Sequence, residues 1–137
     1  FAAPGALADA YVLEQLYATL RETTAWRMPF RFLRGLQADV LLAQLQLRLG
    51  FGADDVRPVD RIGKIGKPLI LLAGSADPFI DRDQVVALQT AAAGSPLAWF
   101  EGAGHVDLLR YDRLRYRDVV LPFLSTNLCQ TGVGDHV

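Results

Sequence analysis

The feature of this sequence that most constrains its fold is a short apolar run, PLILLAG over residues 68–74, which is bounded by proline and glycine. A continuous apolar run of this length, without polar alternation, is typical of a strand buried on both faces of a parallel sheet. A second run, LAWFEG over residues 97–102, has the same character. We therefore expect two buried strands in the second half of the chain.

The residues between these two runs have the pattern of an amphipathic helix. Asp81 stands where a helix N-cap is expected, and Gln84 follows three residues later, as in a capping box. Val85, Leu88 and Ala92 continue at helical spacing. A strand–helix–strand order predicts parallel strands joined by a crossover, and hence an α/β fold with helices packed over a sheet.

The rest of the chain shows more helical than strand character. The apolar spacing predicts one amphipathic helix over residues 6–21 and a second over residues 36–49, which Gly50 ends. Pro29 forbids an uninterrupted helix between them, and we interpret the stretch TTAWRMPFRFLRGL, residues 23–36, as a covering flap. After a connection rich in Gly, Asp and Pro, the chain is expected to end in a helix that carries Tyr116 to Leu124, followed by a flexible tail.

Composition excludes several classes of protein. The 137 residues are 51% hydrophobic and 21% charged, which is too apolar for a disordered chain. The net charge of -1 and the scattered arginines argue against a nucleic-acid partner. Apolar runs are too short for a membrane span, so we expect a soluble protein with no membrane partner. The single cysteine, Cys129, cannot form an internal disulfide, which favours a cytoplasmic location.

Two titratable side chains follow the two expected strands. Asp77 lies in the loop GSADPFID after the first strand, and His105 lies in EGAGHVD after the second. Neighbouring parallel strands end at the same edge of a sheet, so both side chains are expected to emerge side by side. An aspartate bonded to one imidazole nitrogen fixes the tautomer and leaves the other nitrogen free to accept a proton from a nucleophile. Asp77 and His105 are therefore our candidate catalytic residues.

Other interpretations of these residues are open at this point. An aspartate after a strand often only closes a turn by bonding nearby amides, and a histidine in a loop is usually ordinary. A metal ion is a further alternative, because carboxylates and imidazole suit several divalent ions. Its ligands would come from Asp77, Asp81, Asp83, His105 and Asp107, although Asp81 is better explained as a helix cap. We expect no metal and no cofactor.

Three stretches of the chain together resemble the C-terminal part of an α/β-hydrolase: PLILLAGSADPFIDRDQVVALQ, PLAWFEGAGHVDLL and YRDVVLPFL. Asp77 within GSAD matches the acid motif of that family, and His105 within GAGH matches its histidine motif. The resemblance implies a hydrolase core portion over residues 56–125, a helical cap-like or flanking segment over residues 1–55, and a tail over residues 126–137. It also implies hydrolysis of an ester, thioester or amide.

The sequence departs from that family at the nucleophile. No G-x-S-x-G elbow is present, and Ser75, Ser95 and Ser125 do not stand between a strand and a helix in the required way. We therefore expect a fragment that is not competent alone. The missing half of the sheet and site would come from an N-terminal portion of the same protein, a bound fragment or self-association.

Two functional hypotheses follow from these residues. In the first, the chain supplies acid and histidine to a hydrolase that acts on a small-molecule substrate, and Phe79, Ile80 and Val106 line an apolar substrate pocket. In the second, the chain is a non-enzymatic interaction module, its apolar helices bind a partner, and His105 is incidental. A separation between Asp77 and His105 too great for contact would favour the second.

Overall fold

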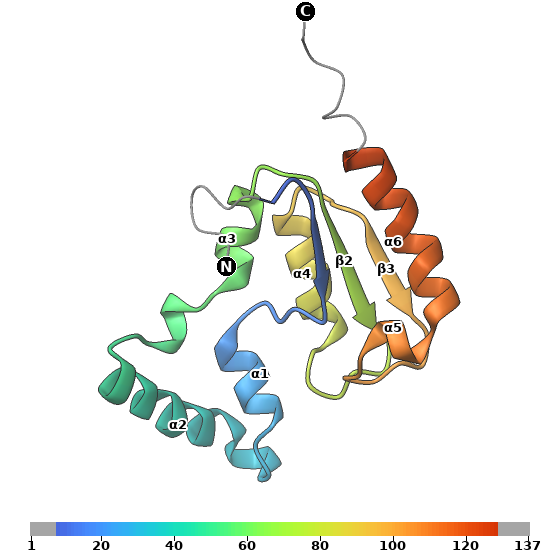
Figure 1. The fold of residues 1–137 in the computed structure, drawn as a ribbon. Coiled ribbons are helices and arrows are strands. Elements are labelled where there is room, and N and C mark those ends of the chain that lie inside the picture. The colour runs from blue at the N-terminus through green and yellow to red at the C-terminus, as the bar shows by residue number, and fades with distance from the viewer. Residues whose placement is uncertain (1–7, 129–137) are drawn as a thin grey trace, which may run out of the picture.

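The protein is a mixed α/β structure built on a parallel sheet. The computed structural model describes residues 8–128. Within them, β1 (Tyr11–Glu14), β2 (Leu69–Gly74) and β3 (Leu97–Phe100) form one sheet in the order β1-β2-β3, and both pairings are parallel. Figure 1 shows the three arrows pointing the same way. The predicted α/β class and the parallel arrangement of the two apolar strands are confirmed.

Helices pack on the two faces of this sheet and extend beyond the carboxyl ends of its strands (Figure 1). The α-helices are α1 (Leu20–Trp26), α2 (Arg34–Leu49), α3 (Pro58–Arg61), α4 (Arg82–Ala91), α5 (Leu108–Tyr111) and α6 (Arg113–Leu128), and short 3-10 turns cover Arg31–Leu33, Ala53–Asp55 and Ile62–Lys64. No helix among the described residues is both long and apolar enough to cross a membrane.

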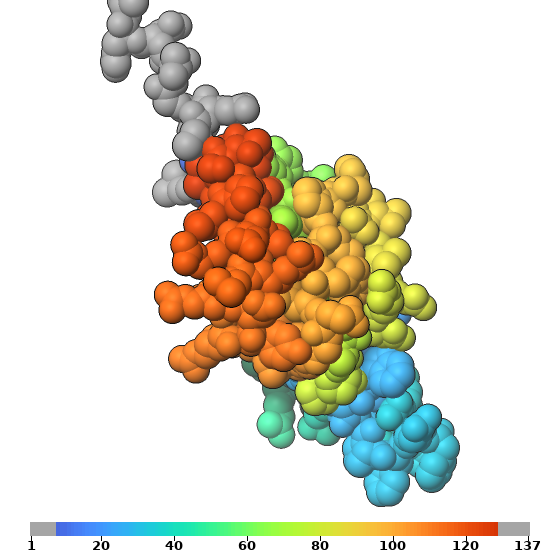
Figure 2. Space-filling view, turned by 90° about the vertical axis from the view of Figure 1, so that its right-hand side faces the viewer, coloured from blue at the N-terminus to red at the C-terminus, as the bar shows by residue number. Residues whose placement is uncertain are grey.

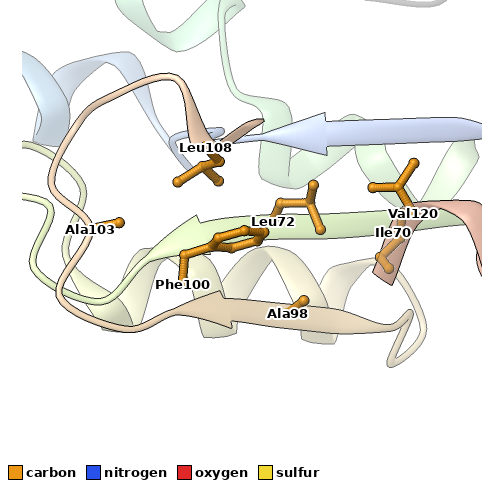
Figure 3. Packing of buried hydrophobic residues seen from close by; sticks show 7 residues of the cluster. All are labelled: Ile70, Leu72, Ala98, Phe100, Ala103, Leu108 and Val120. Atoms are coloured by element: carbon orange, nitrogen blue, oxygen red, sulfur yellow. The ribbon is translucent and has the colours of Figure 1, made fainter. Parts of the chain in front are cut away.

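Alternate residues of the strands supply two separate cores. On one face, Leu69 and Leu71 pack with Ile62 and with Leu88 of α4. The opposite face carries a cluster closed by α5 and α6, which consists of Ile70, Leu72, Ala98, Phe100, Ala103, Leu108 and Val120 (Figure 3). All six residues of β2 are buried, as the unbroken apolar run predicted.

The expected helix over residues 6–21 is wrong. Tyr11–Glu14 form β1 and pair with β2, and Gln15 has a φ of 47°, which cannot continue a helix. The apolar spacing fits a helix, but the pairing partner of Tyr11 is Leu69, far along the chain, so local pattern could not reveal the strand. Part of the expected cap segment 1–55 therefore belongs to the sheet.

The flap and the tail also differ from expectation. Helix α1 runs from Leu20 to Trp26, so the first part of the expected flap is helical, and this helix ends before Pro29. Residues 126–128 of the expected tail are part of α6, and the remaining tail residues lie outside the described residues. The second expected helix is present as α2 and ends at Gly50 in the left-handed conformation, as predicted.

A buried glutamine joins α4 to the residues around α1. Asp81 does stand at the N-cap of α4, but its side chain makes no capping hydrogen bond. Gln84 is buried, and its Oε1 accepts from the N–H of Ala18 at 3.3 Å and from Oγ1 of Thr23 at 3.5 Å. The capping box is therefore not formed, and the carboxamide instead satisfies buried donors of a distant segment.

Helix α6 is attached to β1 through a tyrosine whose ionisation is linked to folding. The Tyr116 hydroxyl donates to the Glu14 carboxylate. Burial, with this hydrogen bond next, raises the pKa of Tyr116 from 10.0 to about 12. Because the folded pKa is raised, the stabilisation is complete below pH ~10 and is lost as the pH rises towards 12.

We expect Tyr116→Phe to reduce the pH dependence of stability in this window. Urea unfolding of the wild-type protein should show a larger loss of stability between pH ~9 and ~12 than the variant does, because the variant lacks the titrating hydroxyl. Equal losses in the two proteins would show that the ionisation of Tyr116 is not linked to folding.

Candidate active site

The acid loop follows β2 directly and is closed by the carboxylate of Asp77. Its Oδ1 accepts hydrogen bonds from the N–H of Phe79 at 2.8 Å and from the N–H of Ile80 at 3.2 Å. The Asp77 side chain is only 3% exposed. The turn interpretation of Asp77 is thus correct for one carboxylate oxygen, and the second oxygen remains available for another partner.

His105 lies in the loop between β3 and α5. Gly102 begins the turn with a φ of 71°, a conformation that glycine adopts without strain. At the other end of the loop, Asp107 is the N-cap of α5 and accepts from the N–H of Arg110 at 3.1 Å. The loop is therefore fixed at both ends, with the imidazole between them.

The two loops bring Asp77 and His105 into direct contact. Nδ1 of His105 lies 2.8 Å from Oδ2 of Asp77, and the imidazole is 36% exposed. With the carboxylate ionised, Nδ1 is the donor of this bond, and the lone pair resides on Nε2 of the imidazole. Among the described residues, Nε2 has no hydrogen-bond partner in the structure. The predicted proximity of the two side chains is confirmed.

Aromatic and cationic groups surround the exposed side of the pair. The Phe79 ring meets the His105 ring edge to face, with centroids 5.6 Å apart, and the Arg27 guanidinium carbon lies 4.8 Å from the Phe79 centroid. Figure 2 shows α1 and the residues after it (blue to cyan) next to the yellow-green segment that follows β2. The segment before β2 thus reaches the site, and this contact was not foreseen from the sequence.

The three residues expected to line a substrate pocket have different environments. Ile80 is 5% exposed and packs with Ala73 and Val85 in the core, so it presents almost no surface. Phe79 is half-buried beside the imidazole, whereas Val106 is 48% exposed. Phe79 and Val106 are therefore the members of this set that have surface available for a substrate.

The serines of the chain are engaged in other hydrogen bonds. Ser75 joins the two loops, because its Oγ donates to the Glu101 carboxylate at 2.9 Å and accepts from the N–H of Gly102 at 2.8 Å. Ser95 and Ser125 donate to backbone carbonyls one turn earlier in the chain. None of these hydroxyls bonds to His105 in the structure.

The close approach of the two loops depends on Gly74, the last residue of β2. A Cβ at this position would lie 2.3 Å from the carbonyl oxygen of Ala103 and 2.8 Å from that of Gly104. The N–H of Ala76 also donates to the Ala103 carbonyl at 2.9 Å. The histidine loop therefore folds back over the end of β2, where there is room only for a hydrogen atom.

The structure gives no support to a metal site. Within residues 8–128, no group of three or more histidine, cysteine, aspartate or glutamate side chains is placed to hold an ion. A surface pocket of about 390 Å³ lies beside β3 and α5, but neither Asp77 nor His105 lines it; it is lined by Trp99, Phe100, Glu101, Tyr111, Asp112 and Arg115. The Asp77–His105 pair lies outside this pocket.

Fold and site together define an α/β protein that presents a bonded aspartate–histidine pair at the carboxyl edge of a parallel sheet. No protein-family model matches the chain, and no curated protein matches it.

Proposed function

We propose that this chain supplies the acid and the histidine of an α/β-hydrolase that cleaves an ester, thioester or amide. The observation that carries the proposal is the 2.8 Å bond between Oδ2 of Asp77 and Nδ1 of His105, at the ends of adjacent parallel strands. The two glycine-containing motifs around these residues add to it. The nucleophile would come from a segment other than the described residues, whose serines bond elsewhere.

Each group has a defined role in the proposed reaction. Nε2 of His105 accepts the hydroxyl proton as the nucleophile oxygen attacks the substrate carbonyl carbon, and the imidazolium then gives this proton to the leaving group. Water repeats the sequence to release the acid product. Asp77 holds the imidazole in the tautomer with the proton on Nδ1 and stabilises the imidazolium. Its own carboxylate is held by two backbone N–H donors.

The proposed hydrolase needs further strands beside the three that the described residues form. Within the described residues, β1 pairs only with β2, so its other edge is open to a further strand. A preceding segment of the same protein is the source that we favour for this strand and for the nucleophile. The interaction-module hypothesis loses the observation that would have favoured it, because Asp77 and His105 are in contact.

An aspartate substitution tests this proposal. In the protein that includes the preceding segment, Asp77→Asn is expected to lower kcat/KM for an activated ester by about 10⁴-fold, because the amide no longer selects the productive tautomer. The matched control is Asp81→Asn, since the Asp81 side chain is exposed and caps nothing. If both variants hydrolyse the ester at the wild-type rate, Asp77 is not the acid of a triad.

A further inference from the structure

Gln15 is the first residue after β1, and its backbone is held in an unfavourable conformation. Gln15 lies one residue beyond the end of β1, and its backbone N–H donates to the carbonyl oxygen of Leu72 at 2.8 Å. Its φ of 47° lies in the left-handed region, which is sterically unfavourable for a residue with a Cβ. Such a conformation persists only where surrounding contacts hold it, and the Gln15 side chain makes contacts of this kind.

The carboxamide of Gln15 binds the chain on both sides of His105. Its Nε2 donates to the carbonyl oxygen of Gly104 at 3.1 Å and to that of Val106 at 2.7 Å. An amide NH₂ group has two hydrogens, so one side chain can satisfy both carbonyls at once. The backbone immediately before and immediately after the imidazole is therefore fixed to the end of β1.

This contact spans the width of the sheet. β1 and β3 are both neighbours of β2, so their ends are separated by roughly 10 Å, twice the spacing of adjacent strands. The histidine loop covers this distance because it crosses over Gly74, which has no side chain to block it. The long side chain of Gln15 spans the remaining distance to the loop carbonyls. A serine or asparagine side chain at position 15 would be too short.

We propose that Gln15 is a positioning residue for the proposed hydrolase: it sets the orientation of the His105 imidazole toward Asp77 by holding the carbonyls of Gly104 and Val106. This inference rests on the proposed function for its catalytic meaning. Two anchors act on His105, one on its side chain and one on its backbone. Asp77 binds Nδ1 from the end of β2, and Gln15 holds the backbone from the end of β1.

The test is the isosteric variant Gln15→Glu, because a carboxylate accepts hydrogen bonds and cannot donate to two carbonyls. In the full 137-residue chain, NMR of isotope-labelled imidazole nitrogens reports which nitrogen of His105 carries the proton, and a His136→Gln variant assigns the two histidine signals. The wild-type protein should show the proton on Nδ1, bonded to Asp77. In Gln15→Glu this tautomer should no longer predominate.

The matched control is Gln89→Glu. Gln89 also donates its side-chain N–H to a backbone carbonyl, that of Ser95 at 3.1 Å, but far from the site. Loss of this bond should lower stability without changing the His105 tautomer. If Gln15→Glu does not fold, Gln15→Asn serves instead, since asparagine tolerates positive φ but is too short to reach both carbonyls. A His105 tautomer that is the same in the Gln15 variants and in Gln89→Glu would overturn the inference.

A kinetic measurement separates this inference from the proposed function. In the protein with its preceding segment, Gln15→Glu should lower kcat for an activated ester by about 10²-fold and change KM little, because a misplaced base affects the transition state more than substrate binding. A tautomer that depends on Gln15, in a protein that hydrolyses no ester, would support the positioning role and refute the hydrolase. An unchanged kcat in an active enzyme would refute the positioning role alone.

Discussion

In the proposed hydrolase, with the preceding segment proposed for it, replacing His105 by alanine is expected to abolish nearly all ester hydrolysis, with a loss in kcat of about 10⁶-fold. The imidazole is the only group in the proposed reaction that both accepts and returns the proton, and no other described side chain bonds to Asp77 in its place. Without it, the nucleophile hydroxyl stays protonated. The loss should therefore be larger than that of Asp77→Asn, which leaves a base in place.

Two further measurements make this expectation specific. His136→Ala is the matched control, because it removes the other histidine of the chain and should leave hydrolysis unchanged. The His105 side chain is 36% exposed, so free imidazole should enter the vacated space in His105→Ala and restore part of the rate. Full activity in His105→Ala would contradict the assignment of His105 as the base.

The central unit of the fold could be predicted from the sequence because its signals are local. The run over residues 68–74 is bounded by proline and glycine and is apolar throughout, and the structure has β2 at Leu69–Gly74. The run over residues 97–102 contains β3, which ends at Phe100, two residues before the end of the run. Once these strands are parallel neighbours, chain direction places the loops of Asp77 and His105 at the same edge of the sheet.

β1 could not be predicted because its residues carry no decisive local signal. Leu13, Leu16, Tyr17 and Leu20 have helical spacing, and only the pairing of Tyr11–Glu14 with β2 decides in favour of a strand. This error concealed the end of the strand, where the backbone turns at positive φ. With a helix expected there, nothing indicated that Gln15 would reach the histidine loop.

The supporting hydrogen bonds of the site were missed for the same reason. Ser75 was excluded as the nucleophile from the sequence, but its actual role, which is to join the two loops, was not predicted. Gln84 was interpreted as half of a capping box, but its carboxamide binds residues more than 60 positions away. Polar side chains such as these have no periodic pattern, and their partners are defined only when distant segments come together.

Gly74→Ala is expected to lower the free energy of unfolding by about 3 kcal/mol, the upper part of the range for a group inserted where there is no room. The atoms that the new Cβ would meet, at 2.3 and 2.8 Å, are backbone carbonyl oxygens of Ala103 and Gly104, so no side chain can rotate away. Urea unfolding measures the loss. Gly35→Ala is the matched control, since its Cβ meets nothing within 4 Å, and it should stabilise helix α2 by up to about 1 kcal/mol.

The same substitution should disturb the site before it unfolds the protein. To relieve the contact, the histidine loop must move away from the end of β2, and this movement lengthens both the bond from Asp77 to His105 and the bonds from Gln15 to the loop carbonyls. The folded fraction of Gly74→Ala should therefore show the same shift in the His105 tautomer as Gln15→Glu. A Gly74→Ala protein with wild-type stability and a wild-type tautomer would mean that the two loops do not depend on this close approach.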